Sequence, residues 1–196
     1  QTRHRPGEIE GRQAEQHDLA GRHDDAVNAL AKAVEAGDLD ATTELGKRLL
    51  LGDRAPYLPS DGANLLADAA RAGNADGARH LATLAALGAH VPQSWSTALS
   101  LLVLAADRGS QSARDQLQTL AERAPDPGHG ERQWRTLAEQ IDLRPWLTPP
   151  PRTTLSAEPL VQTFPNFVTD AVCSWLIERA RPHLKRAMIY DAVGGK

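Results

Sequence analysis

The sequence is poor in the residues that hold small secreted or zinc-binding domains together. Its single cysteine, Cys173, excludes an internal disulfide and a zinc site built from several cysteines. Aromatic residues make up only 4% of the chain. The 22 Lys and Arg residues nearly balance the 25 Asp and Glu residues, which disfavours a nucleic-acid-binding surface because such surfaces are basic. The longest run without a polar residue, Leu101–Ala106, is far shorter than the roughly 18 residues of a membrane span.

Alanine, by contrast, is abundant and occupies 32 of the 196 positions. It combines the highest helix propensity with a small volume, so helices rich in alanine can pack closely. The composition therefore predicts a mainly α-helical protein. A chain of 196 residues is also long enough to bury a hydrophobic core.

An internal repeat of 36 residues organises the first two-thirds of the chain. Three segments of the repeat align without a gap, and such a fixed period is typical of solenoids. The positions that recur at this interval are Leu30, Leu66 and Leu102; Gly37, Gly73 and Gly109; Leu45, Leu81 and Leu117; and Gly52 and Gly88.

The recurring positions predict a helix–turn–helix unit. Glycine tolerates the left-handed backbone that follows a helix, so Gly37 and its equivalents predict the end of the first helix, and Gly52 and Gly88 the end of the second. Good N-cap residues directly follow the first set of glycines and predict the start of the second helix: Asp38, Asn74 and Ser110. N-caps of the first helix are predicted at Asp24, Ser60 and Ser96.

The pattern continues in weaker form at both ends of the repeat region. Residues 8–20 fit a helix that ends at Gly21, and residues 131–143 fit another first helix, which Pro145 ends. No second helix is expected after it. Terminal repeats of a solenoid are usually atypical because one face has no neighbour. The prediction is an α-solenoid of about three and a half helix–turn–helix repeats.

These units resemble the Sel1-like repeat, a relative of the tetratricopeptide repeat. The family pattern AxxGxxxAxxxLGxxYxxGxGV can be followed from Ala33 to Gly52 and again from Ala69 to Val91. The match is carried by Leu45, Gly46, Gly52, Leu81, Gly88 and Val91, whereas Leu49 and Ala85 replace the usual tyrosine. The resemblance implies a right-handed α-solenoid over residues 8–144 that holds a protein or peptide partner and does no chemistry.

The composition changes near residue 145. Six of the eight aromatic residues lie after residue 130, and alanine becomes less frequent there. The segment PWLTPPP, which begins at Pro145, is too rich in proline to continue a helix. It predicts a stiff extended linker over residues 145–157 and a different domain over residues 158–196.

The last segment predicts a strand, a helix and a second strand. Residues 160–164 fit a strand, Pro165 and Asn166 a turn, and Thr169 the N-cap of a helix over residues 170–184. Residues 187–193 fit the second strand. The helix should bury one apolar face, made of Val172, Leu176, Ala180 and Leu184 and widened by Cys173 and Ile177.

The segment PLVQTFPNFVTDAVCSWLIERARPHLKRAMIYDAVGGK resembles the opening of the prolyl-4-hydroxylase-like family of Fe(II)- and 2-oxoglutarate-dependent dioxygenases. The resemblance implies the truncated α+β start of a double-stranded β-helix domain. Ala187 departs from the serine that is frequent in the family. The matching positions are Phe164, Asn166, Phe167, Thr169, Cys173, Leu176, Ile177, Ala180, Pro182, Leu184, Asp191 and Gly194.

The resemblance implies an enzyme that holds iron with an HxD motif and a distal histidine. Its cofactors would be Fe(II), 2-oxoglutarate and ascorbate, and its substrate a peptidyl or related group. The family's metal site lies beyond the matched segment, so no catalytic, cofactor-binding or metal-binding residue is assigned to this chain. We expect the 196-residue chain alone to be inactive. The alternative is a non-catalytic scaffold of helical repeats for protein–protein interaction.

Two His-x-carboxylate motifs occur within the chain. His23 and Asp25 flank Asp24, and the repeat register favours a helix cap with solvated neighbours over a pair of iron ligands. His129 and Glu131 lie in the turn-rich segment PDPGHGE, which provides no rigid neighbours to orient a metal ligand. We interpret neither motif as a metal site.

The remaining candidates have a functional and a structural interpretation. Cys173 could be a nucleophile near a helix N-terminus, but a buried core cysteine fits its place beside the apolar face better. Trp95 and Trp134 could form an aromatic ledge for a peptide, but core packing between alanine-rich helices is favoured. We interpret the others as surface or packing residues: His80, His90, His183, Arg71, Arg79, Arg108 and Arg114.

The two ends of the sequence predict an excerpt of a longer protein. The chain begins with Gln1 rather than Met and ends at Lys196 after two glycines. Several basic residues lie near the start, but no apolar signal-peptide core follows them. We expect a cytoplasmic protein whose true N-terminus precedes Gln1.

Overall fold

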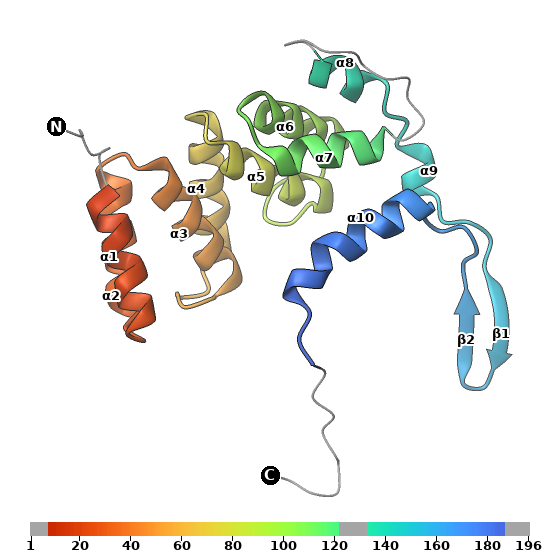
Figure 1. Ribbon diagram of the computed structural model, residues 1–196, viewed down its shortest axis with the longest axis horizontal. Coiled ribbons are helices and arrows are strands. Elements are labelled where there is room, and N and C mark those ends of the chain that lie inside the picture. The colour runs from red at the N-terminus through yellow and green to blue at the C-terminus, as the bar shows by residue number, and fades with distance from the viewer. Residues whose placement is uncertain (1–7, 122–132, 187–196) are drawn as a thin grey trace, which may run out of the picture. The chain divides into compact units, whose positions relative to one another are not determined.

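The computed structural model describes residues 8–121 and 133–186 (Figure 1). The chain divides into two compact units, Gln1–Ile141 and Asp142–Lys196, and each is described here by itself. The first unit is helical throughout its described part, and the second combines a two-stranded sheet with short helices. The predicted fold class, a mainly helical solenoid, is confirmed.

The first unit is a chain of helices in which each helix packs against the next. Corresponding helices begin 36 residues apart, at positions 23, 59 and 95 for one set and 39, 75 and 111 for the other. The final helix of the unit packs against the two before it. The helices are α1 (Glu8–Leu19), α2 (His23–Glu35), α3 (Leu39–Leu51), α4 (Pro59–Arg71), α5 (Ala75–Leu87), α6 (Trp95–Asp107), α7 (Gln111–Leu120) and α8 (Gln133–Glu139).

The tight turn inside each repeat is built as predicted. Gly37 has a φ of 83°, and the N–H of Asp38 donates to the carbonyl of Ala33, so the last turn of α2 closes as a Schellman motif. The carboxylate of Asp38 then accepts from the N–H groups of Asp40 and Ala41 and caps α3. Asn74 and Ser110 cap α5 and α7 in the same way.

The predicted N-caps of the first helices are wrong by two residues. Asp24, Ser60 and Ser96 each lie inside a helix, because α2, α4 and α6 begin at positions 23, 59 and 95. The reason is a backbone hydrogen bond that fixes the residue before the helix. Leu58 N–H donates to the carbonyl of Leu49, and the equivalent Ser94 N–H donates to that of Ala85. Of the three residues before these helices, only Ser94 accepts a capping hydrogen bond with its side chain.

The core of the solenoid is made mainly of alanine and leucine. The two largest fully buried side chains among the described residues are Leu66 and Leu117. Between α3 and α4 even alanine would be too large. A Cβ atom on Gly62 would lie 2.6 Å from the carbonyl oxygen of Gly46 and 2.6 Å from the backbone nitrogen of Leu50. The two backbones therefore pack directly on one another at this crossing.

The helices at the two ends of the unit differ slightly from the prediction. Helix α1 ends at Leu19, and Gly21 follows it with a φ of 71°. Helix α8 ends at Glu139 rather than at residue 143, because the N–H groups of Gln140 and Ile141 bond carbonyls only three residues back. Residues 131 and 132 lie outside the described residues.

The second unit contains more regular structure than its proline content predicts. Pro145 does not end a helix but lies in the first turn of a short one, α9 (Arg144–Leu147), where the missing N–H of proline costs nothing. Strand β1 (Thr153–Ala157) pairs antiparallel with β2 (Leu160–Thr163) across a turn that contains the cis peptide bond Glu158–Pro159. The sequence predicted β2 but placed β1 within the linker over residues 145–157.

The helix of the second unit begins where it was predicted. The hydroxyl of Thr169 accepts from the N–H of Val172 and caps α10 (Asp170–Ala180), and the 3-10 turn η1 (Arg181–His183) follows. The predicted apolar face is not covered, however. Val172 is buried, whereas Leu176 and Leu184 are 48% and 74% exposed. The predicted strand over residues 187–193 lies outside the described residues.

Candidate functional site

A groove with charged residues on both walls lies between α1 and α3 in the first unit. It is an open cavity of about 480 Å³. Helix α1 forms one wall, the first three turns of α3 form the other, and the buried Leu30 of α2 contributes to the lining. The lining residues are Gly11, Arg12, Ala14, Glu15, Leu30, Asp38, Asp40, Ala41, Glu44 and Arg48.

The groove follows from an irregularity in the repeat. The link between α1 and α2 covers residues 20–22, whereas the equivalent links cover residues 52–58 and 88–94. At the next junction, between α3 and α5, the Asn74 side chain bridges the two helices. Its amide donates to Asp40 at 2.8 Å and its oxygen accepts from Thr43 at 3.1 Å. The equivalent of Asn74 on α3 is Asp38, which hydrogen-bonds within α3 and makes no such bridge to the described part of α1.

A buried ion-pair network joins α1 to α3 beside the groove. The Arg48 guanidinium donates to Asp18 at 2.6 Å and to Glu44 at 2.9 Å. The side chains of Asp18 and Arg48 are only 8% and 12% exposed. Glu44 also accepts from Lys47 at 2.6 Å. The network holds α1 against α3 by charge-assisted hydrogen bonds, which are stronger than neutral ones.

The network shifts the pKa values of its members. Burial alone would raise the pKa of Asp18, but the hydrogen bonds from Arg48 and His23 outweigh it and hold that pKa below its ordinary value. The pKa of Glu44 is lowered in the same way, against burial, by the hydrogen bonds from Lys47 and Arg48. One guanidinium nitrogen of Arg48, Nη1, is buried without a hydrogen-bond partner among the described residues.

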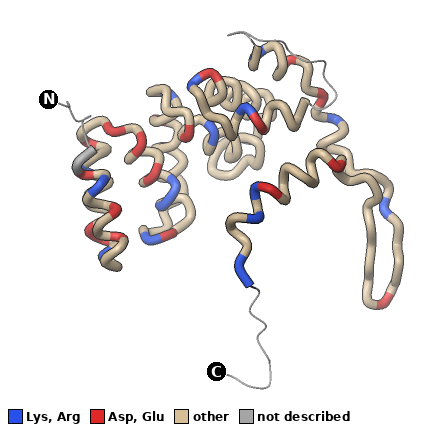
Figure 2. The backbone as a smooth tube through the Cα atoms, viewed as in Figure 1, with Lys and Arg blue, Asp and Glu red and all other residues tan. Residues whose placement is uncertain are grey.

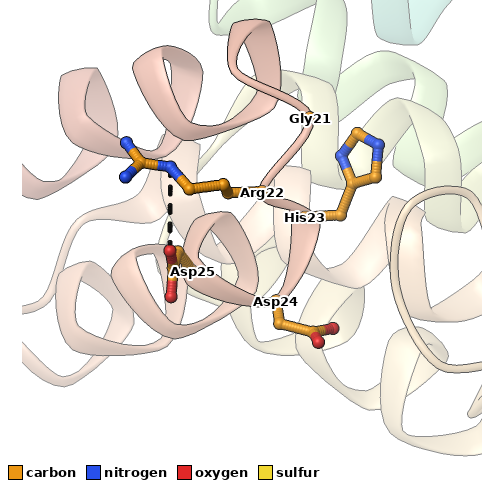
Figure 3. Close-up of a pocket in the computed structure, with 5 residues that line it drawn as sticks. All are labelled: Gly21, Arg22, His23, Asp24 and Asp25. Atoms are coloured by element: carbon orange, nitrogen blue, oxygen red, sulfur yellow. Dashed lines mark ion pairs between the residues drawn. The ribbon is translucent and has the colours of Figure 1, made fainter.

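The HxD motif does not form a metal site. His23 and Asp25 line a cavity of about 400 Å³, but Figure 3 shows the imidazole and the carboxylate pointing away from each other. His23 Nδ1 lies 3.1 Å from Asp18, whereas Asp25 lies 3.8 Å from Arg22. Within residues 8–121 and 133–186, no three His, Cys, Asp or Glu side chains come together in a way that could hold a metal ion.

Two further candidate sites were considered from the sequence, Cys173 and the pair His129 and Glu131. Cys173 is a half-buried free thiol on α10, and its N–H donates to the carbonyl of Thr169. His129 and Glu131 lie outside the described residues.

The histidines of the repeat region are not equivalent. His80 is half-buried on α5, and its Nε2 lies 3.0 Å from the Arg79 guanidinium. Burial, together with the positive charges of Arg79 and Lys47, lowers the pKa of His80 to about 4. His80 is therefore a neutral hydrogen-bond acceptor at neutral pH. His90 in the repeat region and His183 in the second unit are exposed, in agreement with their interpretation as surface or packing residues.

The two tryptophans of the repeats were interpreted as core residues, and the four arginines as surface or packing residues. The structure places them as follows. Trp134 packs on the buried cluster around Leu117, and the Arg114 guanidinium lies 5.6 Å from its ring centre, which favours the core role. Trp95 is half-buried at the start of α6. Arg71 and Arg108 are exposed, but Arg79 and Arg114 are half-buried and take part in packing. Figure 2 shows basic and acidic residues interspersed along the solenoid.

Comparison with a solved structure supports the helical repeat fold. The crystal structure of a Sel1 repeat protein from Oxalobacter formigenes superposes with a TM-score of 0.56 at 18% sequence identity. The fold is that of a Sel1 repeat solenoid. The match covers 71% of this chain and 60% of that protein. No model of a known protein family and no curated protein sequence matches the chain.

The resemblance of the repeats to Sel1-like repeats is thus confirmed at the level of the fold. The prolyl-hydroxylase-like interpretation of residues 158–196 stays a prediction. In the described part of the chain, none of the helices has the length and apolar character that crossing a membrane requires.

Sequence reasoning missed the groove and its residues. Arg12, Glu15, Glu44 and Arg48 are ordinary charged residues of amphipathic helices and carry no motif. The signal that could have found them is the interval between Gly21 and Gly52, which falls short of the 36 residues between Gly52 and Gly88. A shorter link at an otherwise regular junction indicates that the two helices meet differently there.

Proposed function

We propose that the solenoid of α1–α8 is a scaffold that binds partner proteins. The observation that carries the proposal is the groove between α1 and α3, a cavity at a junction where the link between helices is shorter than the equivalent links of the next two repeats. The Sel1 repeat fold supports it, since repeat solenoids present extended binding surfaces. The fold alone names no partner.

The scaffold function can be tested with a library of short linear peptides displayed on phage. The full chain is immobilised and selected against the library, and a parallel selection on the urea-unfolded chain removes peptides that bind exposed sequence alone. We expect enriched peptides that bind the folded chain and shift the backbone NMR signals of residues 8–141. Enrichment on the unfolded chain alone, or shifts confined to residues 142–186, would contradict the scaffold function.

We further propose that residues 158–196 are the opening of a prolyl-4-hydroxylase-like dioxygenase domain, to which the solenoid recruits a peptidyl substrate. One feature favours an incomplete domain. Among its described residues Val172 is the only buried hydrophobic side chain, and the indole nitrogen of Trp175 is buried without a hydrogen-bond partner. The exposed large hydrophobic residues in the described part of the second unit are Trp146, Leu147, Leu155, Leu160, Val161, Phe164, Phe167, Leu176, Ile177 and Leu184.

Such a unit buries too little apolar surface to offset the conformational entropy lost on folding. A larger domain would cover these side chains. The described residues do not fit an iron site, because the side chains of the HxD motif point apart and belong to a solenoid helix. Fe(II), 2-oxoglutarate and ascorbate would therefore bind to parts of the enzyme outside this chain, and no catalytic step is assigned to it.

This second proposal is tested on the coding sequence beyond Lys196. We expect an HxD motif followed by a distal histidine, and Fe(II)-dependent formation of succinate from 2-oxoglutarate by the longer protein. The 196-residue chain serves as the negative control. A continuation without the motif would leave a non-catalytic scaffold, and turnover by the control would overturn the assignment of the metal site to another segment.

A further inference from the structure

The groove between α1 and α3 carries an excess of negative charge. Four carboxylates and two guanidinium groups line it. The charge of Arg48 is already neutralised by Asp18 and Glu44, and Glu44 also pairs with Lys47. The charges that remain in the lining are those of Glu15, Asp38 and Asp40 against that of Arg12.

None of these four remaining side chains forms an ion pair in the described part of the chain. Asp40 accepts a hydrogen bond from Asn74, which is neutral and leaves the charge uncompensated. Asp38 caps α3, where the helix dipole offsets part of its charge. Glu15 is exposed on the opposite wall. A cation that enters the groove would meet Asp38 and Asp40 on the α3 wall and Glu15, with Arg12 near it in the sequence, on the α1 wall.

The lining also contains an apolar surface. Leu30 is 3% exposed, and Ala14 and Ala41 lie with it between the charged walls. Lysine and arginine side chains carry long apolar stems below their charged ends and pack these stems on such surfaces. A groove with an apolar lining and acidic walls therefore complements a lysine or arginine side chain better than a free inorganic cation.

We propose that the groove between α1 and α3 binds a segment of a partner protein through a lysine or arginine side chain, which lies beside Glu15 and Asp40. The inference rests on the proposed scaffold function and specifies the chemistry of the partner. At the junction between α3 and α5, by contrast, the Asn74 side chain bridges the two helices through Thr43 and through one oxygen of Asp40, Oδ1, which leaves the other oxygen of Asp40 for the ligand.

The proposal is tested by NMR titration of the isotope-labelled full chain with three blocked peptides: Ac-Gly-Gly-Lys-Gly-Gly-NH2, its arginine counterpart and its norleucine counterpart. We expect the lysine and arginine peptides to shift the backbone signals of residues 11–15 and 38–48 in a saturable way. Norleucine has the same stem without the charge, and its peptide should not. Added salt should weaken the binding, since the attraction is between partly exposed charges.

Three variants sharpen the test. Glu15→Lys should weaken binding of the lysine peptide about fivefold, the effect of losing one partly exposed ion pair. Glu35→Lys makes the same charge change on an exposed residue of α2 that does not line the groove, and should leave binding unchanged. Arg12→Gln removes the cation that repels the ligand and should strengthen binding.

The proposal is overturned if the norleucine peptide shifts the same signals with the same midpoint. Equal binding by the Glu15→Lys and Glu35→Lys variants, or the absence of saturable shifts in the groove, would overturn it as well. The scaffold function fails separately. Phage-selected peptides that bind the solenoid away from the groove would preserve the scaffold and eliminate this site, whereas a lack of selected peptides would eliminate both.

Discussion

Among single residues, Gly62 occupies the position where the solenoid leaves the least room. Its missing Cβ would lie 2.6 Å from two backbone atoms of α3, which no side-chain movement can relieve. We expect Gly62→Ala to lower the free energy of unfolding by about 2 kcal/mol, as overpacking does. Urea denaturation followed by circular dichroism measures this change.

Gly11→Ala is the matched control for this substitution. Gly11 also lies inside a helix, but a Cβ there would meet nothing within 4 Å. Because alanine is a better helix former than glycine, the variant should gain up to about 1 kcal/mol. Equal effects of the two substitutions would show that the α3–α4 crossing is not as close as described.

His80 should make the stability of the solenoid depend on pH. Its pKa in the folded chain is about 4, below the ordinary value of 6.5, so the unfolded chain takes up the proton first as the pH falls. Stability should therefore be lost between pH 6.5 and about 4 and then level off. Because His80 is only half-buried, we expect a loss of about 1 kcal/mol between neutral pH and pH 5.

Thermal unfolding of the chain and of His80→Gln at neutral pH and at pH 5 checks this. Glutamine keeps a hydrogen-bond acceptor for Arg79 but does not titrate, so the variant should lose less stability than the parent chain. Asp18 and Glu44 do not confuse the comparison, since their pKa values lie below the ordinary 3.8 and 4.5 and affect stability only at lower pH. Identical pH dependence in both proteins would rule out the role of His80.

Among the elements, the N-terminus of α5 has a cap residue, Asn74, that also binds α3. The Asn74 oxygen accepts from the N–H of Gly77 and from Thr43, while its amide donates to Asp40 of α3. Asn74→Ala should thus cost about 2 kcal/mol, the upper end of the range for a lost N-cap. Ser60→Ala should change stability by no more than about 0.5 kcal/mol, because Ser60 lies inside α4 and its hydroxyl caps nothing.

Chemical denaturation of the two variants compares these effects directly. The comparison also tests the position of the helix starts, since the repeat pattern alone assigns the cap to Ser60. A large loss in Ser60→Ala would restore the cap that the sequence assigned to Ser60, whereas a small loss in Asn74→Ala would contradict the cap and bridge described at Asn74.

The elements that the sequence predicted correctly are those in which one residue decides the local backbone. Gly37 and Asp38 end one helix and begin the next through their own φ angle and side chain, so their spacing alone located three turns. The starts of α4 and α6 depend instead on backbone hydrogen bonds to distant residues such as Leu49, which a sequence pattern does not reveal. Strand β1 was missed because the prolines before it indicated an extended linker.

The groove was missed for a related reason. Its walls come from helices that are separately ordinary, and the opening depends on a link too short to repeat the bridge that Asn74 makes at the next junction. The Asp18–Arg48 pair joins residues far apart in the sequence. Such pairs follow from the packing of helices and not from any local motif.

At the scale of the whole chain, the two units differ in how much apolar surface they bury. We expect a chain of residues 1–141 to unfold cooperatively and to keep the thermal stability of the full chain within a few degrees. Residues 142–196 alone should show no cooperative transition, because Val172 is the only hydrophobic side chain buried in their described part. Calorimetry of the two pieces measures this.

Binding of a fluorescent hydrophobic dye provides a second readout of the same prediction. The full chain should bind the dye more strongly than residues 1–141, since the second unit carries most of the exposed large hydrophobic side chains among the described residues. A cooperative transition in the short piece would mean that it folds as a domain of its own. Equal dye binding by the full chain and the long piece would mean that its apolar side chains are covered.

The hydrogen bonds from Leu58 to Leu49 and from Ser94 to Ala85 tie each repeat to the one before it in the same way. Residues 59–94 form a module that can be joined end to end. Its last residue, Ser94, makes the same backbone hydrogen bond as Leu58, the residue that precedes the module. A second copy inserted after Ser94 would be joined at both ends by the same type of backbone hydrogen bond. The scaffold can therefore be lengthened by duplication of this one segment, without changes to the residues that join it to its neighbours.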